Sequence, residues 1–439
     1  MRIYNFLLVA LFVLGHPLLA QKTKLSKEEA VQLTLENNFG IVIANNNLKV
    51  AENNKGLLNS GFLPAISANG GASYDNNDQE ATFQDGSTSS IDGAETTRYN
   101  ASVNLNYTLF DGLGRWYNYK RLKEEYNLSE LQARETIETT ILQLFTVYYE
   151  VARLTENIVV LQETYVNTEN RLTRAEYSFE FGQNNKLDVL NAQVDLVNDS
   201  INLMNERQTL KNTQRDLNVL LNRELSTDFI VDTTVVFTNQ IVLEEFLVDA
   251  EANNVRMLQA EKNITINDYN LKIGKSVFLP TVGLTGSYGW NQGNFPETNF
   301  LSTSTSTGFS GGVNLSWNLF NGGGSITQIK NAKILLDSQE TFEKQIKQEI
   351  RRDISNAQGN YQNRLQVYQL QEQNVITATN NYERSNERYK LGQITSVELR
   401  QAQINLLNTQ TSKSLAKYNA KLAELQLLQL TGQLLNVDF

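Results

Sequence analysis

Four segments of the chain alternate apolar and polar residues with a period of two. One face of each segment is rich in aliphatic and aromatic residues, and the other carries Asn, Ser, Thr and Gly with hardly a charge. Such alternation over about ten residues is typical of outer-membrane strands, which face lipid outward and water inward. A half-buried soluble sheet shows the same alternation, so both structures stay open at this point. We expect strands over residues 63–75, 98–110, 279–291 and 308–320.

Two very long segments with helical character follow these strand pairs. They cover residues 113–181 and 323–391, contain no proline, and would each span roughly 100 Å. A glycine ends each of them, and further helices are expected over 183–222 and 393–432. After the first glycine, apolar residues recur at the alternating spacing of a coiled-coil seam: Leu187, Leu190, Val194, Val197, Ile201 and Met204. We therefore expect each half to fold back into a helical hairpin of the coiled-coil type.

The same order of motifs occurs twice along the chain. FLP at 62–64 recurs at 278–280, VNLNYTLFDG at 103–112 recurs as VNLSWNLFNG, and FGQNNKLDVLNAQVDLV at 181–197 recurs as LGQITSVELRQAQINLL. The first half is longer within the polar run Asp75–Thr97, which we interpret as a surface loop tip. The repeats predict four parts after residue 20: a first repeat over 21–222, an equatorial linker over 223–241, a second repeat over 242–432 and a tail over 433–439.

Composition narrows the chemistry that this chain can perform. Residues 1–20 have the charge, apolar core and small final residue of a secretory signal peptide. The only histidine, His16, lies in that segment, and the chain has no cysteine. The remaining chain therefore lacks the residues for Cys/His zinc sites, iron–sulfur clusters, cysteine nucleophiles and Ser-His-Asp triads. We expect no cofactor, no resident metal and no catalytic residue. A net charge of −10 argues against nucleic-acid binding.

The number of predicted strands has a consequence if the sheet spans a membrane. A membrane sheet must close into a barrel because an open edge cannot be satisfied in lipid. The smallest single-chain barrels have eight strands, so four strands per chain predict that two or three chains associate. Aromatic side chains near the strand ends would then form the belts at the two lipid–water interfaces. We assign this role to Tyr74, Tyr107, Tyr288, Trp290 and Trp317.

Taken together, these motifs resemble the TolC-like outer-membrane efflux proteins of Gram-negative bacteria. The resemblance is carried by KEEAVQLTLENN at 27–38, both FLP junctions, both LF-[DN]-G strand ends and both Gly-x5-[DE] segments, and it covers nearly all of the chain after residue 20. It implies an α+β membrane protein: a homotrimer with a 12-stranded outer-membrane β-barrel, continued by a long α-helical coiled-coil barrel in the periplasm. It also implies a passive exit channel of a tripartite efflux or type I secretion system, working with a periplasmic adaptor (membrane fusion) protein and an inner-membrane RND or ABC-type pump.

The resemblance also assigns roles to residues at the two glycine turns. Gly182, Gln183, Gly392 and Gln393 would form the periplasmic tips that meet the adaptor. In related channels, polar links between neighbouring hairpins hold the entrance closed. The matching gate positions here are Asp188, Tyr389 and Glu398.

Two gate positions depart from the family pattern. Ile394 stands where relatives carry an arginine, and Gln401 stands where they carry a second acid. We therefore expect hydrogen bonds alone to hold the gate. Plainer explanations of the matching residues stay open, because acids near a helix N-terminus are favourable in any helix and glycine suits a left-handed turn. The alternative function is a periplasmic coiled-coil adaptor or scaffold without a channel, and a secreted enzyme is a further rival.

Overall fold

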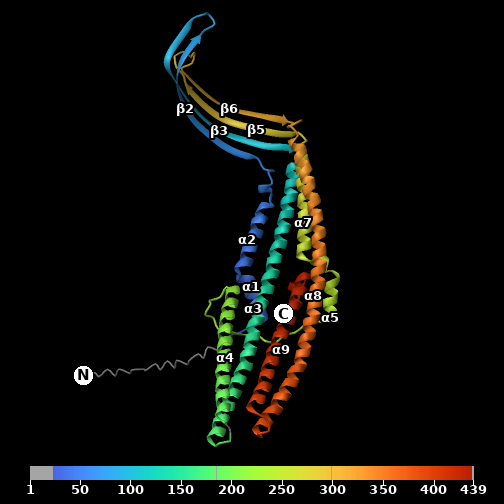
Figure 1. The fold of residues 1–439 in the computed structure, drawn as a ribbon. Coiled ribbons are helices and arrows are strands. Elements are labelled where there is room, and N and C mark those ends of the chain that lie inside the picture. Colours follow the sequence, from blue (N-terminus) through green and yellow to red (C-terminus); the bar gives the residue numbers. More distant parts are fainter. Residues whose placement is uncertain (1–22, 184, 298, 438–439) are drawn as a thin grey trace, which may run out of the picture.

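The computed structural model describes residues 23–183, 185–297 and 299–437, so the predicted signal peptide lies outside the described residues. The molecule is elongated: a curved sheet forms one end and helices running away from it form the rest (Figure 1). Within the described residues, no helix combines the length and the apolar character that crossing a membrane requires.

The sheet has four antiparallel strands in the order β2-β3-β5-β6. Pro64 and Pro280 directly precede the first strand of each pair, where they disfavour helix and remove a backbone donor. Both edge strands, β2 and β6, have one side without a partner in this sheet. The strands are β2 (Ala65–Thr82), β3 (Thr88–Asp111), β5 (Thr281–Asn294) and β6 (Thr303–Ser316).

The polar run in the first half is not a loop, so that prediction was wrong. β2 and β3 continue through it as a hairpin, with Asp75 paired to Thr96 and Thr82 paired to Thr88. The true turn covers 83–87, where the backbone N–H of Phe83 donates to the carbonyl of Ser87 at 2.8 Å. A hairpin surrounded by water needs no apolar face, so its residues lack the alternation that identified the other strands. In the second half, β6 ends at Ser316 rather than at residue 320.

Helices of equal length leave the sheet in both halves. α3 (Gly114–Glu180) and α8 (Gly324–Lys390) each contain 67 residues, and the shorter α4 (Lys186–Leu220) and α9 (Ser396–Leu430) fold back along them. The two resulting hairpins end at the pole opposite the sheet (Figure 1).

The predicted coiled-coil seam of α4 does not pack within its own hairpin. Leu187, Val194 and Val197 each expose about 60% of their surface. Instead, Val189 and Ala192 are buried against Ala175 of α3. The heptad pattern correctly marks an apolar stripe, but a pattern in one helix does not say which other helix covers it. The stripe of Leu187, Leu190, Val194, Val197, Ile201 and Met204, here called the α4 stripe, lies exposed in the single chain.

The helical segment that precedes the first strand is broken into two helices. Asn38 ends α1 (Lys27–Asn37) and caps α2 (Phe39–Asn54), and its amide also donates to the carbonyl of Leu220 at 2.9 Å. Asn254, its counterpart in the second half, caps α7 (Val255–Ser276) and donates to Leu430 at 2.8 Å. The second half also contains α5 (Gln240–Val248) and α6 (Ala250–Asn253), and short 3-10 turns cover Leu57–Asn59 and Leu434–Asn436.

The main core lies around the middle of α3. Phe145, Tyr148 and Tyr149 are almost completely buried there, and the ring of Tyr149 stacks on Tyr418 of α9 at 5.6 Å. The linker contributes β4 (Phe229–Val231), which pairs in parallel with β1 (Thr23–Leu25). The hydroxyl of Tyr148 donates to the carbonyl of Leu25 at 2.9 Å, and burial raises the pKa of this tyrosine to about 12. This packing fixes the hairpins at their middle and leaves their ends far from the core.

Candidate functional site at the helical tips

The turns of the two hairpins have the same backbone geometry. Gly182 and Gly392 both have φ of 71°, a left-handed conformation that side chains with a Cβ rarely adopt. The next residue in each turn closes the helix end: Gln183 N–H donates to the carbonyl of Ser178 at 2.7 Å, and Gln393 N–H donates to Arg388 at 2.9 Å. An added Cβ would meet nothing within 4 Å at either glycine. Both positions therefore need glycine for the turn itself and not for space.

A polar cleft of about 570 Å³ joins the two tips. Its lining includes every residue predicted for the gate and the tips except Gly182: Gln183, Asp188, Tyr389, Gly392, Gln393 and Glu398. Residues of the first and second hairpins, separated by about 200 positions in the sequence, thus face one cleft. The predicted gate and tip residues therefore lie near one another, but sharing a cleft does not mean that they are hydrogen-bonded to one another.

The two acids of the cleft have different surroundings. Glu398 belongs to a capping box: its carboxylate accepts from the Thr395 backbone at 2.7 Å, and the Thr395 hydroxyl accepts from the Glu398 backbone at 3.2 Å. Hydrogen bonds donated to the carboxylate, first by the Thr395 backbone and then by the Thr395 hydroxyl, lower the pKa of Glu398. Asp188 sits in the first turn of α4, which Asn185 caps. Within the described part of the chain, the Asp188 carboxylate makes no hydrogen bond to Tyr389.

Arg174 of α3 occupies the cleft beside Tyr389. Its guanidinium lies over the tyrosine ring, 5.5 Å from the centroid, and donates to the carbonyl of Lys390 at 2.8 Å. A cation over an aromatic face is worth about 0.5–1 kcal/mol at an exposed site. Arg174 thus brings an arginine of the first hairpin beside Tyr389, a contact that the comparison of motifs around the glycines did not reveal.

A buried charge cluster ties the hairpins together above the cleft. Arg400 of α9 donates to both carboxylate oxygens of Asp199 of α4, at 2.7 and 2.8 Å. Arg171 of α3 pairs with Asp195 of α4, whose carboxylate also lies 3.6 Å from Arg400. The side chains of Asp199 and Arg171 are each only 3% exposed. Burial alone would lower the pKa of Arg400, but Asp199 outweighs it and raises this pKa above its ordinary value.

Neutral side chains complete this cluster. The Thr168 hydroxyl donates to Asp199 at 2.7 Å, and the Gln403 amide donates to Thr168 at 3.0 Å and to the carbonyl of Thr164 at 3.0 Å. Buried charges are tolerated when they are paired and hydrogen-bonded in this way. We name the group Thr168, Arg171, Asp195, Asp199, Arg400 and Gln403 the inter-hairpin clamp.

The clamp was not anticipated because charged residues in long helices usually face water. The repeat aligns Arg400 with Leu190, and Asp199 with Thr409, so the two halves differ in charge at these positions. Exposed charges such as Lys186 and Asp216 also differ between the repeats, so this difference alone does not identify a buried contact.

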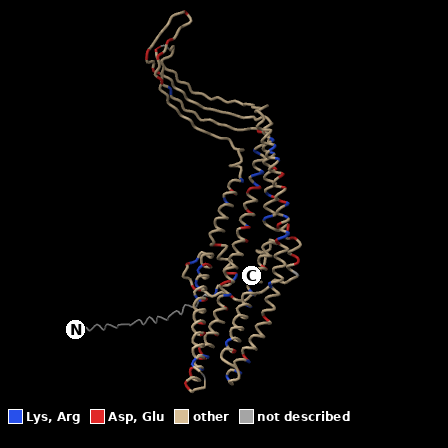
Figure 2. The backbone as a smooth tube through the Cα atoms, viewed as in Figure 1, with Lys and Arg blue, Asp and Glu red and all other residues tan. Residues whose placement is uncertain are grey.

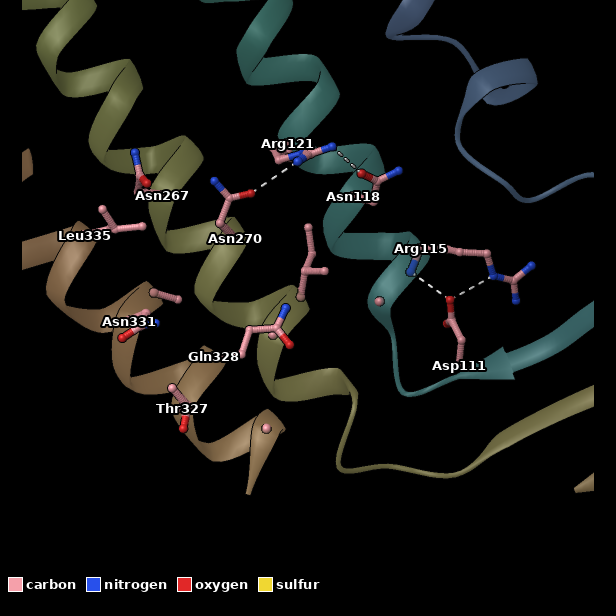
Figure 3. A pocket seen from close by; sticks show the side chains of 15 residues that line it. Asp111, Arg115, Asn118, Arg121, Asn267, Asn270, Thr327, Gln328, Asn331 and Leu335 are labelled. Atoms are coloured by element: carbon pink, nitrogen blue, oxygen red, sulfur yellow. Dashed lines mark hydrogen bonds and ion pairs between the residues drawn. The ribbon is translucent and has the colours of Figure 1, made fainter. Parts of the chain in front are cut away.

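A second polar cleft lies where the helices meet the sheet, with a volume of about 960 Å³. Figure 3 shows Arg121 of α3 between Asn118 and Asn270, to which it donates at 2.8 and 3.3 Å. Amide and guanidinium side chains, among them Arg115, Arg121 and Asn270, form much of its lining beside apolar residues such as Ile273 and Leu335. Across the described ranges, no cluster of His, Cys, Asp or Glu suits a metal ion.

The aromatic residues predicted for the membrane belts are spread along the sheet from its helical end outward. Tyr74 pairs with Thr97 and Trp290 with Ala101, toward the end of the sheet that is far from the helices. Tyr107 pairs with Leu284, and Trp317 donates its indole N–H to the carbonyl of Phe278 at 3.0 Å, near the helical end. Tyr288 lies between these positions, paired with Val103. Two interfaces would require two separate levels of rings, which this spread does not single out, and the belt role stays a prediction.

Comparisons with known proteins agree with this architecture. Residues 30–223 and 246–433 match the family described as outer membrane efflux protein. The chain is 23% identical to outer membrane protein TolC of Vibrio cholerae over 383 residues, which are 86% of this chain and 84% of that protein. The fold is similar to the CmeC outer membrane channel of Campylobacter jejuni, with a TM-score of 0.78 and 17% identity. This match covers 93% of this chain and 86% of CmeC. The fold is also similar to the outer membrane protein VceC of Vibrio cholerae, with a TM-score of 0.73 and 15% identity. This match covers 92% of this chain and 96% of VceC.

These matches decide between the alternatives left open by the sequence. The family match covers both repeats, and the structural matches cover more than nine-tenths of the chain, sheet included. The predicted combination of strands and long helical hairpins in two tandem repeats is confirmed, and the adaptor or scaffold without a channel is not favoured. The chain belongs to the outer membrane efflux protein family.

Proposed function

We propose that three copies of this chain form the passive exit channel of a tripartite efflux or type I secretion system. The open four-stranded sheet carries this proposal. Its edges, β2 and β6, have unpaired sides that lipid cannot satisfy, so copies must join edge to edge until the sheet closes. Three copies give a 12-stranded barrel, which is wide enough to begin opening a lumen, whereas an eight-stranded interior is filled by side chains.

The helices would close in the same way below the membrane. Each chain contributes two hairpins, and the α4 stripe lies on a side that its own chain leaves uncovered. Apolar residues at heptad spacing bury themselves against another helix when one is available. In the trimer that helix belongs to the neighbouring subunit, so the stripe is an inter-subunit seam of the helical barrel.

The tips would form the entrance of the channel. Three copies supply six tips, and the cleft between the two tips of each chain holds Asp188, Tyr389 and Glu398 as gate residues. Gly182, Gln183, Gly392 and Gln393 would meet the hairpins of a periplasmic adaptor, which links the channel to an RND or ABC-type pump in the inner membrane. The pump supplies the energy and chooses the cargo.

The basic test of this function is oligomeric state and conductance. Purified from the outer membrane, the chain should run as a heat-sensitive trimer and should form discrete channels in planar lipid bilayers. Recovery as a soluble periplasmic monomer without channel activity would contradict the proposal.

Replacing Val197 by aspartate should disrupt the trimer. The change places three charges in the proposed seams, and each loses the burial of a valine, worth about 1.5–3 kcal/mol. The fraction of trimer on semi-native gels measures the effect. Asn198→Asp adds the same charge to an exposed neighbour on α4 and should leave the trimer intact. Equal behaviour of the two variants would place the α4 stripe outside the interface.

Replacing Asp188 by asparagine should loosen the entrance and raise the single-channel conductance. The substitution removes a charged acceptor from the cleft without changing its shape, so it isolates the contribution of charge. Asp216→Asn, on an exposed part of the same helix and far from the cleft, serves as the control. A conductance unchanged from that of the parent channel would reject Asp188 as a gate residue.

A further inference from the structure

Three helices carry the same lysine spacing where they meet the sheet. The segments are KRLK at 120–123 on α3, KIGK at 272–275 on α7 and KNAK at 330–333 on α8. Figure 2 shows basic residues gathered on the helices just below the sheet, although the chain as a whole is acidic. The pairs on α3 and α8 occupy equivalent positions of the two repeats. We name Lys120, Lys123, Lys272, Lys275, Lys330 and Lys333 the lysine collar.

The collar lies on one particular side of these helices. At 3.6 residues per turn, Trp116, Lys120 and Lys123 project from the side of α3 opposite Asn118 and Arg121. The latter two line the polar cleft of Figure 3. Aromatic residues and lysines thus occupy one side, and the other side combines amide side chains with Arg115, Arg121 and Asp111. The first side suits a lipid interface and the second suits a water-filled interior.

Most of the collar has no acidic partner. Lys272 pairs with Asp268 at 2.6 Å. For the other five lysines, the described residues provide no carboxylate within 4.0 Å, and Lys123, Lys275, Lys330 and Lys333 are exposed. Five lysines without an ion-pair partner leave positive charge on these helices for a bound anion to neutralise.

Aromatic rings accompany the lysines. The ammonium of Lys120 lies 5.0 Å from the ring centroid of Trp116, that of Lys123 lies 4.5 Å from Tyr119, and that of Lys272 lies 5.2 Å from Tyr269. Aromatic side chains of this amphipathic kind concentrate at the level of lipid headgroups. The same rings therefore place the lysines at that level.

The distance from the sheet agrees with this level. Lys120 and Lys330 each lie six residues after the first residue of their helix. At 1.5 Å per residue, that is about 9 Å along the axis. A headgroup layer is roughly 5–8 Å thick on each side of the hydrocarbon core, so Lys120 and Lys330 are expected at its lower border.

We propose that the lysine collar binds the phosphate groups of anionic phospholipids in the periplasmic leaflet of the outer membrane. The inference rests on membership of an outer-membrane family and on the orientation of the helices toward the periplasm, and it does not involve the gate. Each lysine close to an anionic surface contributes about 1 kcal/mol of attraction. The collar thereby fixes the depth of the channel in the membrane and selects the lipids around it.

Trp116 offers a direct probe of the lipid beside the collar. The chain has three tryptophans, so Trp290→Phe with Trp317→Phe leaves only Trp116. The full-length trimer is reconstituted into phosphatidylethanolamine vesicles containing equal amounts of either brominated phosphatidylglycerol or brominated phosphatidylcholine. We expect the anionic lipid to quench Trp116 more strongly, and the difference to shrink at high salt.

Substitutions in the collar test whether charge is the cause. Lys120→Gln with Lys123→Gln should lower the preference for phosphatidylglycerol by about tenfold or more. Lys120→Arg with Lys123→Arg should retain it, and so should Lys211→Gln with Lys344→Gln, which removes two exposed lysines far from the sheet. The preference is a ratio of two lipids within each variant, so altered brightness of Trp116 does not affect it.

Two results would overturn the proposal: equal quenching by both lipids in the intact collar, or a preference that survives removal of Lys120 and Lys123. A collar variant that loses an acidic periplasmic protein in crosslinking but keeps its lipid preference would assign the surface to protein binding instead. Conductance is measured on every variant. Channels that conduct but show no lipid preference would contradict only the proposed binding of lipid by the collar. Absence of conductance in the parent protein would contradict the proposed channel function.

Discussion

Replacing Arg400 by leucine is expected to destabilise the hairpin ends by about 3–5 kcal/mol. The change leaves Asp199 buried without its bidentate partner, and uncompensated buried charges carry a cost of this size. Leucine itself suits the helix, because Leu190 stands at the equivalent position of the first repeat. With the clamp broken, the two hairpins of a chain are held near their ends only by weaker contacts such as that of Arg174 with Tyr389. We therefore expect single-channel conductance to rise and thermal unfolding to begin at lower temperature.

A double variant separates the ion pair from simple loss of packing. Asp199→Leu combined with Arg400→Leu removes both charges, and exchanging a buried ion pair for apolar residues is often neutral or stabilising. It should recover much of the stability lost by Arg400→Leu. Arg384→Leu, at an exposed site of α8, controls for the loss of one arginine. If Arg400→Leu matches the Arg384 control in both stability and conductance, the clamp does not hold the entrance.

Replacing Gly392 by valine is expected to abolish export while the trimer persists. The turn requires φ of 71°, which costs an ordinary residue roughly 1–2 kcal/mol and a β-branched one more. Relief of this strain would open the turn and lose the hydrogen bond from Gln393 to Arg388. The tip would then no longer present its shape to an adaptor. Accumulation of a fluorescent efflux substrate in cells that depend on this channel measures export, and semi-native gels measure the trimer.

Asparagine is the matched control at this position because it tolerates the left-handed region far better than valine. Gly392→Asn should therefore retain export. The space beside the glycine favours this comparison, since a Cβ at this position meets no neighbour within 4 Å. Full export by Gly392→Val would show that the shape of this tip is not needed for docking.

Much of the fold could be predicted because its signals are local. Alternation over residues such as Val103, Leu105 and Tyr107 identified a strand, and Gly182 identified a turn. Sequence patterns failed to predict the structure where the outcome depends on what surrounds a segment. The hairpin beyond Asp75 lies in water and has no apolar face to reveal it, and the α4 stripe has a partner that its own spacing cannot name.

The candidate site was predictable only in part for a similar reason. Asp188, Tyr389 and Glu398 lie near the glycines and were found by their spacing from them. Arg400 and Asp199 are 201 positions apart, and nothing in either local sequence indicates the other. Only the folded chain brings α4 and α9 together, so the strongest link between the hairpins was not apparent until both were placed in space.

The extension of β2 and β3 provides a practical means of observing this protein in cells. Because the helices point into the periplasm, the turn at 83–87 lies at the outermost end of the chain, away from both the clamp and the collar (Figure 1). Gly86 in that turn has no neighbour within 4 Å of an added Cβ. A short epitope inserted there would be readable by antibodies on intact bacteria, and three copies per trimer would allow single channels to be counted and followed without disturbing the conducting path.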